Sequence, residues 1–578
     1  MYQGYVIKSI GTSTLKLTGY QILAEVEDMP AAYQHLRVRL RVEQTRLLNW
    51  GAKVGLVEQL LDHPSKTLQL DRNLVFDILL EIQALFKDCV KITNKFDHMV
   101  PLKQHPAQVE ASFDRRFPRG TNAVLTKILN IVEKAPQAGG RLKWVMVKQE
   151  AFKATLEKLI GYNDAIEGLL DRTSIGQLHE MQHQTYMVML QLNSKVDELK
   201  QMSMAMQVKT QPLDRQTLSG LSRAPTLVAG QDDANASLSR LAEFKARQRQ
   251  VEQDDSSVDL EPIRADAVVI MSSDSTRSEA VYLGKSVWIE WKAYGPDHHS
   301  SSAWDEMIED RVKQLASLLG SSGKPKEFRA PQCLGYIEKK SEEKRGFGFV
   351  YDKPGDATSA TKPVSLLELI RTTKIPSLTQ RRALAQAISE SLMYLHSVNW
   401  LHKGIRSDNV VFFVQPGSKA VLTEPILSGF EYARPDTTGE MTEPTPRYSE
   451  NDVYKHPHTL SIARPRSTKS DDVYSMGVVL IEIAHWRSIA DMVGLPKDTK
   501  AARVMMRKVR GMLLEREFLE GIEGVAGDLY EEAVRKCLVG GEELGLAKNA
   551  DETDPEVGAA MHETYSKEIV GRIRDMRV

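Results

Sequence analysis

A short polar loop between two apolar segments carries the residue types that are best suited to chemistry. The loop is HKGIRSDN, from His402 to Asn409, and it follows an apolar helical stretch that ends near Leu395. Arg406 can supply positive charge to an anion, whereas Gly404 has no side chain that could accept a proton. The apolar run VVFF comes next. We therefore expect a helix and a strand to position these polar groups.

This loop resembles the catalytic loop of the protein-kinase family, H-R-D-x-x-x-x-N before a strand. His402 stands at the first position and Asn409 at the last, but Gly404 stands where the family has its aspartate. In a working kinase that aspartate accepts the proton of the attacking hydroxyl, a lysine steadies the phosphoryl group, and the asparagine holds a metal ion. The resemblance thus implies a degenerate loop that keeps Arg406 as a cation and lacks the proton acceptor, so no catalytic residue is assigned.

A second segment, ILSGFEYAR, resembles the metal-binding D-F-G segment of kinases. Gly429 replaces the aspartate, Phe430 is kept, and Glu431 takes the glycine position. The resemblance leaves Asn409 and Glu431 as the remaining candidate metal ligands, and a mispositioned carboxylate is a poor substitute for the lost one. Two catalytic carboxylates are therefore missing from one framework.

The strand-like stretch VWIEWK ends in Lys292, where a kinase has the lysine that grips the nucleotide phosphates. A helix predicted over residues 304–319 would supply its partner, for which Glu306 and Glu309 are both candidates. Upstream, MSSDSTRSEAVYLGK lacks the G-x-G-x-x-G pattern that lets backbone amides approach phosphates. The resemblance implies a nucleotide site of Lys292, Glu309 and Asn409 that holds ATP without phosphoryl transfer. A lysine on an edge strand that only faces water is the alternative for Lys292.

Residues that maintain the kinase fold are kept. The run SDDVYSMGVVLIEIAH matches the D-x-[WY]-S-x-G motif of the central large-lobe helix, with Asp472 and Gly477 in their places. The resemblance implies that Asp472 binds the backbone of the catalytic loop. It also implies that Phe430, Asp472 and Gly477 have structural roles.

Strand patterns followed by helices fill the chain after about residue 262. AVVIM and AVYLGKSVWIEWKAY predict strands around a Gly-Lys hairpin turn, and CLGYIEK and FGFVYD predict a further strand pair. SLLELIR and residues 378–395 predict helices. We expect a two-lobed α+β, kinase-like fold, with an N-lobe over 262–360 and a C-lobe over 361–578.

Amphipathic helices fill residues 1–206, which predicts an all-α bundle. Apolar residues recur at helical spacing over 29–48, with the arginines of that stretch mostly on other faces: Arg37, Arg39, Arg41 and Arg46. A seven-residue repeat from Leu178 to Met206 predicts one long helix, either a coiled-coil seam or the last helix of the bundle.

The patterns YQHLRVRLRVEQTRLLNWGAKVGL and RLKWVMVKQEAFKATLEKL resemble the HeLo domain of fungal prion-inhibition and propagation proteins, over roughly residues 19–199. The resemblance implies a role in fungal programmed cell death or heterokaryon incompatibility, with self-association through the bundle. Such families open with a hydrophobic helix that is held to enter membranes. Residues 1–22 depart from that pattern because they carry Lys8 and Lys16.

Composition limits the location and the partners. A net charge of −1 gives no global reason to expect a nucleic-acid partner. The three cysteines are isolated in sequence, which predicts a reducing, cytoplasmic location, with membrane association on activation.

Residues 207–261 are poor in aromatics and predict a flexible linker with fluctuating helix near 238–251. Two histidine pairs, His298/His299 and His456/His458, lack a third ligand at metal-site spacing, so no zinc site is predicted.

Three functions are compatible with these patterns. The preferred interpretation is a regulatory protein in which a kinase-like domain without catalysis controls a HeLo-like bundle through protein partners. The first alternative is an atypical ATP-binding serine/threonine kinase that uses Lys292, Arg406 and Asn409 with Asp408 or Glu431 in displaced roles. The second alternative is an interaction scaffold with no enzymatic or membrane activity.

Overall fold

The computed structural model describes residues 31–54, 75, 78–79, 81–82, 85, 149–207, 229–253, 261–273, 277–294, 302–340, 345–354, 361–436, 450–460, 466–496, 498–548 and 550–577. The chain divides into two compact units, residues 1–243 and 244–578. The first unit is helical, and the second combines small antiparallel sheets with helices. This arrangement confirms the predicted combination of an all-α region with an α+β region.

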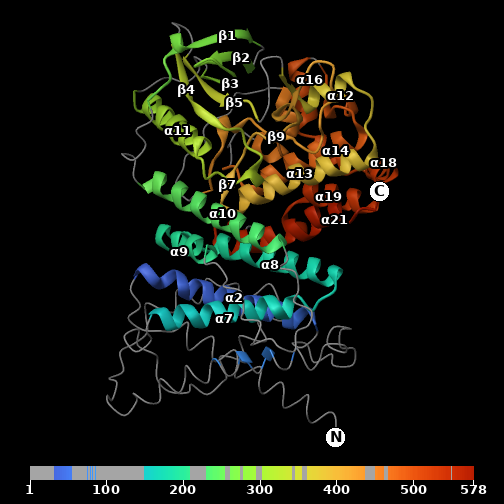
Figure 1. Ribbon diagram of the computed structural model, residues 1–578. Helices are drawn as coiled ribbons and strands as arrows, with labels where there is room; N and C mark the ends of the chain where they lie inside the picture. The colour runs from blue at the N-terminus through green and yellow to red at the C-terminus, as the bar shows by residue number, and fades with distance from the viewer. Residues whose placement is uncertain are drawn as a thin grey trace. The chain divides into compact units, whose positions relative to one another are not determined.

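The described helices of the first unit pack around one apolar core. They are η1 (Ala31–Tyr33), α2 (Gln34–Lys53), α7 (Gln149–Glu167), α8 (Arg172–Leu192) and α9 (Val196–Met206). Helices α2 and α7 lie side by side (Figure 1). Apolar side chains from α2, α7 and α8 meet in the core, among them Leu40, Trp50, Leu159, Ile166 and Leu178. The burial of these apolar side chains is the main force that holds the helices together.

A buried ionic cluster crosses this core, contrary to the prediction that the arginines of α2 lie mostly on other faces. Arg46 is 1% exposed and binds Glu43, Asp164 and Glu167, each at 2.8 Å. Arg39 is also buried and pairs with Glu43 at 2.8 Å. Burial alone would lower the pKa of Arg46, but the three carboxylates raise it well above its usual value. The apolar stripe could not reveal this because two of the acidic partners, Asp164 and Glu167, lie on α7, far along the chain.

The predicted long helix over 178–206 is wrong, because the chain forms α8 and α9 with a break between them. Asn193 has an extended backbone, with φ −94° and ψ 123°, and its side-chain amide donates to Met189 O at 2.6 Å. This side chain therefore satisfies a carbonyl at the end of α8. The residues of the seven-residue repeat are buried on both sides of the break: Leu178 in α8, and Leu199 and Met206 in α9.

Helix α10 (Ala229–Gln253) lies within the stretch predicted to be a flexible linker and contains the helix expected near residues 238–251. In the first unit, the Ser239 hydroxyl lies 2.9 Å from the Ser203 hydroxyl. In the second unit, the ring centroid of Phe244 lies 5.0 Å from that of Phe328. Because α10 buries these side chains, it gains packing that its own composition does not indicate.

The second unit opens with a five-stranded antiparallel sheet in the order β1-β2-β3-β5-β4. Its elements are η3 (Ala265–Ala267), β1 (Val268–Ser273), β2 (Arg277–Tyr282), β3 (Lys285–Tyr294), α11 (Ser302–Gly320), η4 (Lys326–Phe328), β4 (Cys333–Lys340) and β5 (Arg345–Asp352). The β2–β3 turn is Leu283–Gly284, at φ 49° and 76°, one residue earlier than the predicted Gly-Lys turn. This turn places Arg277 directly opposite Glu290. Helix α11 packs against β4.

The remainder of the second unit is mainly helical, with two small sheets, β6-β8-β9 and β10-β7. Its elements are β6 (Lys362–Ser365), α12 (Leu366–Thr372), α13 (Leu378–Ser397), β7 (Trp400–Leu401), η5 (Ser407–Asn409), β8 (Val410–Val414), β9 (Ile426–Leu427), η6 (Phe430–Tyr432), β10 (Arg434–Pro435), η7 (Glu450–Tyr454), η8 (Pro457–Leu460), α14 (Lys469–His485), α15 (Ile489–Met492), α16 (Thr499–Met506), α17 (Val509–Leu513), α18 (Arg516–Ala526), α19 (Asp528–Val539), η9 (Gly541–Leu544), α20 (Pro555–Tyr565), η10 (Ser566–Gly571) and α21 (Arg572–Asp575).

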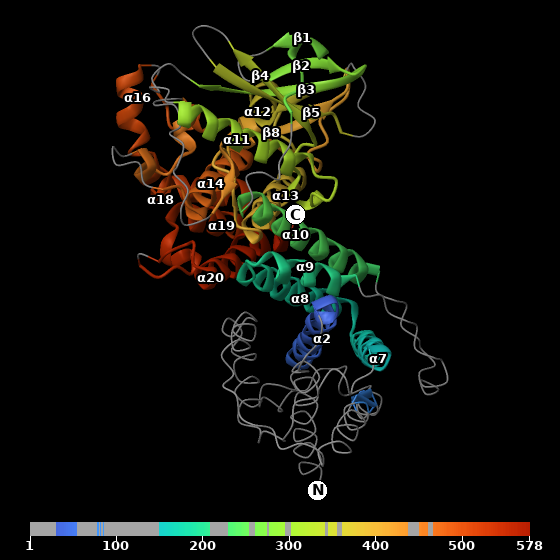
Figure 2. The same cartoon turned by 90° about the vertical axis from the view of Figure 1, so that its left-hand side faces the viewer.

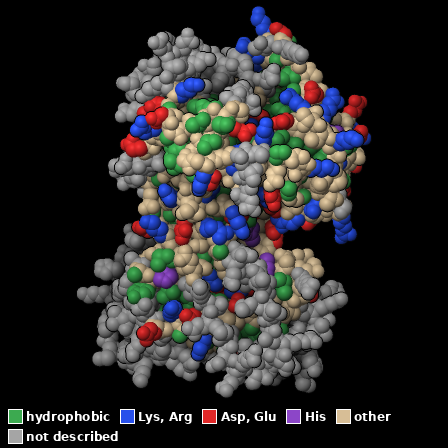
Figure 3. All heavy atoms as spheres, turned by 45° about the horizontal axis from the view of Figure 1, so that its top comes forward, with side chains coloured by type: hydrophobic (Ala, Val, Ile, Leu, Met, Phe, Trp, Pro, Cys, Tyr) green, Lys and Arg blue, Asp and Glu red, His purple; other side chains and the backbone are tan. Residues whose placement is uncertain are grey.

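Helices α13, α14 and α19 form the centre of this part, apart from the five-stranded sheet (Figures 1 and 2). A capping box of Ser377 and Gln380 begins α13. At Gly477 of α14, an added Cβ would lie 2.7 Å from the Cβ of Cys537, so the lack of a side chain lets α14 and α19 approach closely. Basic and acidic side chains of the described residues are interspersed on the face that Figure 3 shows.

None of the helices that the structure describes is both long enough and apolar enough to cross a membrane. The N-terminal stretch of residues 1–22 lies outside the described residues.

The Arg46 cluster makes a prediction about the first unit. We expect Arg46→Ala to lower the free energy of unfolding by about 3–5 kcal/mol, because it leaves three carboxylates without their shared cation. Urea denaturation followed by circular dichroism measures this change. Lys153→Ala is the control because its amine is 58% exposed and 4.0 Å from Glu157, so little loss is expected. An equal loss in both variants would contradict the assignment.

Glu482 of α14 makes a prediction about pH. It is fully buried, accepts hydrogen bonds from Tyr454 OH and Ile489 N, and burial raises its pKa to about 7. Because its pKa is higher in the folded than in the unfolded state, protonated Glu482 stabilises the fold. This contribution to the free energy of unfolding is fully present below pH 4.5 and is lost as the pH rises to about 7. We expect the wild type to lose ~3 kcal/mol relative to Glu482→Gln over this range. Denaturation at several pH values tests this, with the exposed Glu517→Gln as a control that should show no such trend.

Candidate functional site

The loop predicted to be a degenerate catalytic loop is anchored by Asp472. The backbone N–H groups of His402 and Lys403 donate to its carboxylate at 2.7 and 2.8 Å, and His396 Nε2 lies 3.4 Å away. Burial alone would raise the pKa of Asp472, but the hydrogen bonds with His396 and the loop hold it below its usual value. Asp472 is therefore an anion that holds the loop in place, as the kinase resemblance implies.

His402 and Phe430 pack together beneath this loop. Both side chains are fully buried, with ring centroids 4.4 Å apart. The His402 Nδ1 atom accepts a hydrogen bond from Gly404 N at 3.1 Å, and burial lowers the pKa of this imidazole to about 4. The Trp400 ring lies 5.4 Å from that of Phe430. These contacts make both residues part of the packing under the loop, and they leave His402 a weak base.

Gly404 and Gly429 lie where the structure leaves no space for a side chain. A Cβ at Gly404 would lie 2.7 Å from Gly429 O. A Cβ at Gly429, whose φ is +81°, would lie only 1.9 Å from Asn409 Nδ2. A side chain at Gly404 would therefore clash with the backbone of Gly429, and one at Gly429 would clash with the Asn409 amide.

Both the nitrogen and the oxygen of the Asn409 side-chain amide form hydrogen bonds. Its nitrogen donates to Gly404 O at 2.7 Å, and its oxygen accepts from Arg277 at 3.1 Å. The same Arg277 nitrogen lies 3.1 Å from the Ser428 hydroxyl oxygen, to which it also donates. The oxygen that the kinase resemblance assigns to a metal ion is thus bound to a guanidinium from β2.

A strand carboxylate and a loop carboxylate hold that guanidinium. Arg277 Nε donates to Glu290 Oε1 at 3.0 Å, and Arg277 NH1 lies 3.6 Å from Asp408. The other oxygen of Glu290 accepts from Gly429 N at 3.0 Å. Burial alone would lower the pKa of Arg277, but Glu290 and Asp408 hold it above its usual value. We call Arg277, Glu290, Asn409 and Gly429 the arginine cluster.

Sequence analysis did not identify Arg277 or Glu290. A hairpin turn fixes the residues that face each other across two strands, so the correct turn would have shown this cross-strand pair of opposite charges. The contact with Asn409 joins residues far apart in the sequence, and no local pattern indicates it.

Lys292 lies near this cluster on β3. Its amine donates to Glu431 O at 2.5 Å and lies 4.7 Å from the centre of the Tyr432 ring. The side chain is 4% exposed on a strand paired on both sides, so the alternative of a water-facing edge lysine is wrong. Glu309 pairs with Lys313 at 3.2 Å, while the side chain of Glu306 lies outside the described residues.

Each of the two candidate metal ligands faces a cation. Asn409 faces Arg277, and the carboxylate of Glu431 lies 3.9 Å from Arg406. Arg406 also lies 4.0 Å from Asp408. Burial raises the pKa of Glu431 despite this arginine. A metal ion at either position would have to compete with a positive charge already in place.

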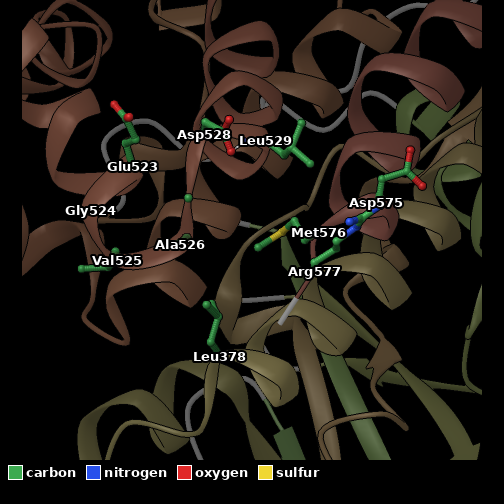
Figure 4. A pocket seen from close by; sticks show the side chains of 11 residues that line it. Leu378, Glu523, Gly524, Val525, Ala526, Asp528, Leu529, Asp575, Met576 and Arg577 are labelled. Carbon is green, nitrogen blue, oxygen red and sulfur yellow. Dashed lines mark hydrogen bonds between the residues drawn. The ribbon is translucent and has the colours of Figure 1, made fainter.

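The space around Lys292 is very small. Lys292, Phe349, Lys403, Glu431 and Tyr432 line a cavity of about 20 Å³. Small-molecule sites commonly occupy about 300–1,000 Å³, so this cavity is far smaller than such sites. A larger open pocket of about 520 Å³ lies elsewhere, where the start of α13, the α18–α19 junction and the C-terminal residues meet (Figure 4).

Comparisons with known proteins assign the first part of the chain most clearly. Residues 13–202 match the HeLo family model, described as prion-inhibition and propagation. This match supports the predicted HeLo resemblance and suggests a regulatory role related to fungal cell death or incompatibility. The HeLo-like region covers most of the helical unit and excludes all residues of the arginine cluster.

The second part of the chain matches a family of unknown function, and a stretch of the chain is similar to a kinase. Residues 341–576 match the domain of unknown function DUF7580. A stretch of 111 residues is 30% identical to the probable serine/threonine-protein kinase PBL18 of Arabidopsis thaliana, covering 19% of this chain and 26% of that kinase. The match to DUF7580 contains Asn409 and Gly429, whereas Arg277, Glu290 and Lys292 precede it.

The close approach of Asn409 to Gly429 makes a prediction. We expect Gly429→Ala to destabilise the second unit by at least about 2 kcal/mol more than Gly417→Ala. Both glycines have positive φ, +81° and +77°, but only Gly429 has atoms within 4 Å of the added Cβ. The difference between the variants therefore isolates the clash with Asn409. Urea denaturation followed by tryptophan fluorescence measures this difference in the free energy of unfolding. Equal losses in the two variants would show that the Asn409 side chain moves aside without a measurable energetic cost.

Proposed function

We propose that this chain is a regulatory protein in which a kinase-like unit without phosphotransfer activity controls a HeLo-like helical unit. Protein partners, including other copies of the chain that associate through the HeLo-like unit, would carry the signal. The setting suggested by the HeLo match is fungal programmed cell death or heterokaryon incompatibility. The expected location is cytoplasmic, with contact to a membrane surface on activation.

The observation that carries the proposal is the hydrogen bond from Arg277 to Asn409. A kinase uses this asparagine to hold a metal ion that bridges the nucleotide phosphates. Here the guanidinium supplies the positive charge itself and is held by Glu290 and Asp408. A second cation would meet repulsion, and the asparagine oxygen is already engaged.

The missing proton acceptor supports the same function. Gly404 cannot take the proton of an attacking hydroxyl, and His402 is a buried base whose pKa is about 4. The clash geometry at Gly404 and Gly429 further indicates that this arrangement has been built around glycine. These features favour a domain kept for its shape over an atypical kinase.

A regulatory unit needs two states that a partner can bias. In the proposal, the closed state is the one held by the arginine cluster, which joins β2 and β3 of the sheet to the loop around Asn409. Breaking this cluster would release the sheet from the loop within the second unit. A partner that binds the released form would shift the equilibrium toward it.

An assay with ATP and Mg²⁺ on the full chain tests the proposal. We expect the wild type to transfer no phosphate from radiolabelled ATP and to show no thermal shift with ATP. Arg277→Ala frees the Asn409 oxygen, so we expect ATP with Mg²⁺ to raise its melting temperature by about 2–4 °C, still without transfer. Arg264→Ala is the matched control because that arginine is 82% exposed and pairs with Asp266.

Two results would contradict the proposal. Phosphoryl transfer by the wild type that Lys292→Ala abolishes would establish the atypical kinase instead. The regulatory role of the HeLo-like unit would be rejected if the wild type and Arg277→Ala neither self-associate on sedimentation nor bind anionic liposomes. That last result would favour the interaction scaffold.

A further inference from the structure

A second cluster of polar side chains lies away from the arginine cluster, where η8 meets the start of α14. His456 and His458 flank Pro457, at the first turn of η8. Asp471 lies in the first turn of α14. One ligand atom from each of these three residues can be chosen so that all three lie within 4.8 Å of one another. Sequence spacing did not indicate this group because its third member belongs to the next helix.

The two imidazole rings lie against each other. The backbone N–H of His458 donates to His456 Nδ1 at 3.2 Å. His458 Nδ1 lies 2.5 Å from the same atom. A neutral imidazole has a lone pair on one of its two nitrogens, and the tautomer decides which one. In the tautomer with its hydrogen on Nδ1, His458 has a lone pair on Nε2.

That lone pair faces another acceptor. His458 Nε2 lies 3.3 Å from Asp471 Oδ1, which is buried and has no hydrogen-bond partner. The other oxygen of Asp471 accepts from Thr468 N at 2.9 Å as part of the capping box of α14. The capping bond thus fixes Oδ1 in its direction toward His458. Two acceptors that face each other repel unless a proton or a metal ion lies between them.

We propose that His456, His458 and Asp471 form a binding site for a divalent transition-metal ion of the zinc class. Two imidazoles and one carboxylate are a ligand set that Zn²⁺ takes in proteins, with a water molecule in the fourth position. Zn²⁺ bonds of about 2.0–2.2 Å place neighbouring tetrahedral ligands about 3.3–3.6 Å apart. The distance of 3.3 Å between His458 Nε2 and Asp471 Oδ1 already matches that spacing.

The surroundings of the site suit a cation. Glu552 accepts from Ser470 N at 2.9 Å, beside Asp471, and its negative charge acts on both Asp471 and His458. Arg510 acts on His456 with the opposite sign. The His456 ring is also held by an edge contact with Tyr474 at 4.9 Å. This site is independent of the function proposed for the arginine cluster.

Titration of the metal-free full chain with Zn²⁺ by calorimetry tests the proposal. We expect one ion per chain in the wild type, and a dissociation constant at least about tenfold higher in His458→Ala, His456→Ala and Asp471→Asn. The His458 side chain is 45% exposed, so its removal should not disturb the core. Asp471→Asn can keep the bond to Thr468 N while losing the carboxylate charge. The control is His485→Ala, another half-buried histidine on α14, whose ring packs near Phe518.

The calorimetric results can either support or overturn the proposed metal site. Weaker binding in the three variants with unchanged binding in His485→Ala supports the site. No stoichiometric binding by the wild type would overturn it and leave a shared proton between His458 and Asp471 as the explanation for their contact. Equal Zn²⁺ affinity in the wild type and His458→Ala would also overturn it. Visible absorption of added Co²⁺ that disappears in His458→Ala would give independent support.

Discussion

The contact between Arg277 and Asn409 is the constraint on which the centre of the second unit depends. The asparagine amide fits only because Gly404 and Gly429 have no side chains beside it. Its oxygen accepts the guanidinium, and Glu290 binds that guanidinium and the backbone of Gly429 together. A side chain at Gly429 would displace the asparagine amide, and Arg277 would then lose one of its acceptors. The two glycines are therefore part of an arrangement that fits closely.

Each of the two units contains a buried arginine that binds several acceptors. Arg46 binds three carboxylates in the helical unit, and Arg277 binds Glu290, Asp408, Asn409 and Ser428 in the other. Burial of a charge is costly, but a planar guanidinium can satisfy several acceptors at fixed angles. Such clusters favour one arrangement of the elements because a shifted helix or strand would leave a buried charge unpaired. They specify geometry more than they add stability.

Much of the fold could be predicted from local patterns. The apolar stripe of α13, the strands around Lys292 and the helix that contains Asp472 all follow from periodicity and motif, because each depends on residues close in sequence. Two differences from the sequence predictions have different causes. The break after Leu192 accompanies a local cap, in which the Asn193 side chain binds Met189 O, whereas α10 packs against partners far along the chain. The one-residue error in the β2–β3 turn concealed the pair of Arg277 and Glu290.

The sequence by itself determined which chemical groups are missing: Gly404 and Gly429 cannot supply carboxylates in any conformation. It also determined the HeLo resemblance and the succession of a helical region and an α+β region. Only the tertiary structure decided that Arg277 binds Asn409, because the two residues meet through folding and no spacing rule links them. It likewise decided that Asp471 lies beside His458. Local patterns record residue type and periodicity, whereas a site made of side chains from separate elements exists only once the chain has packed.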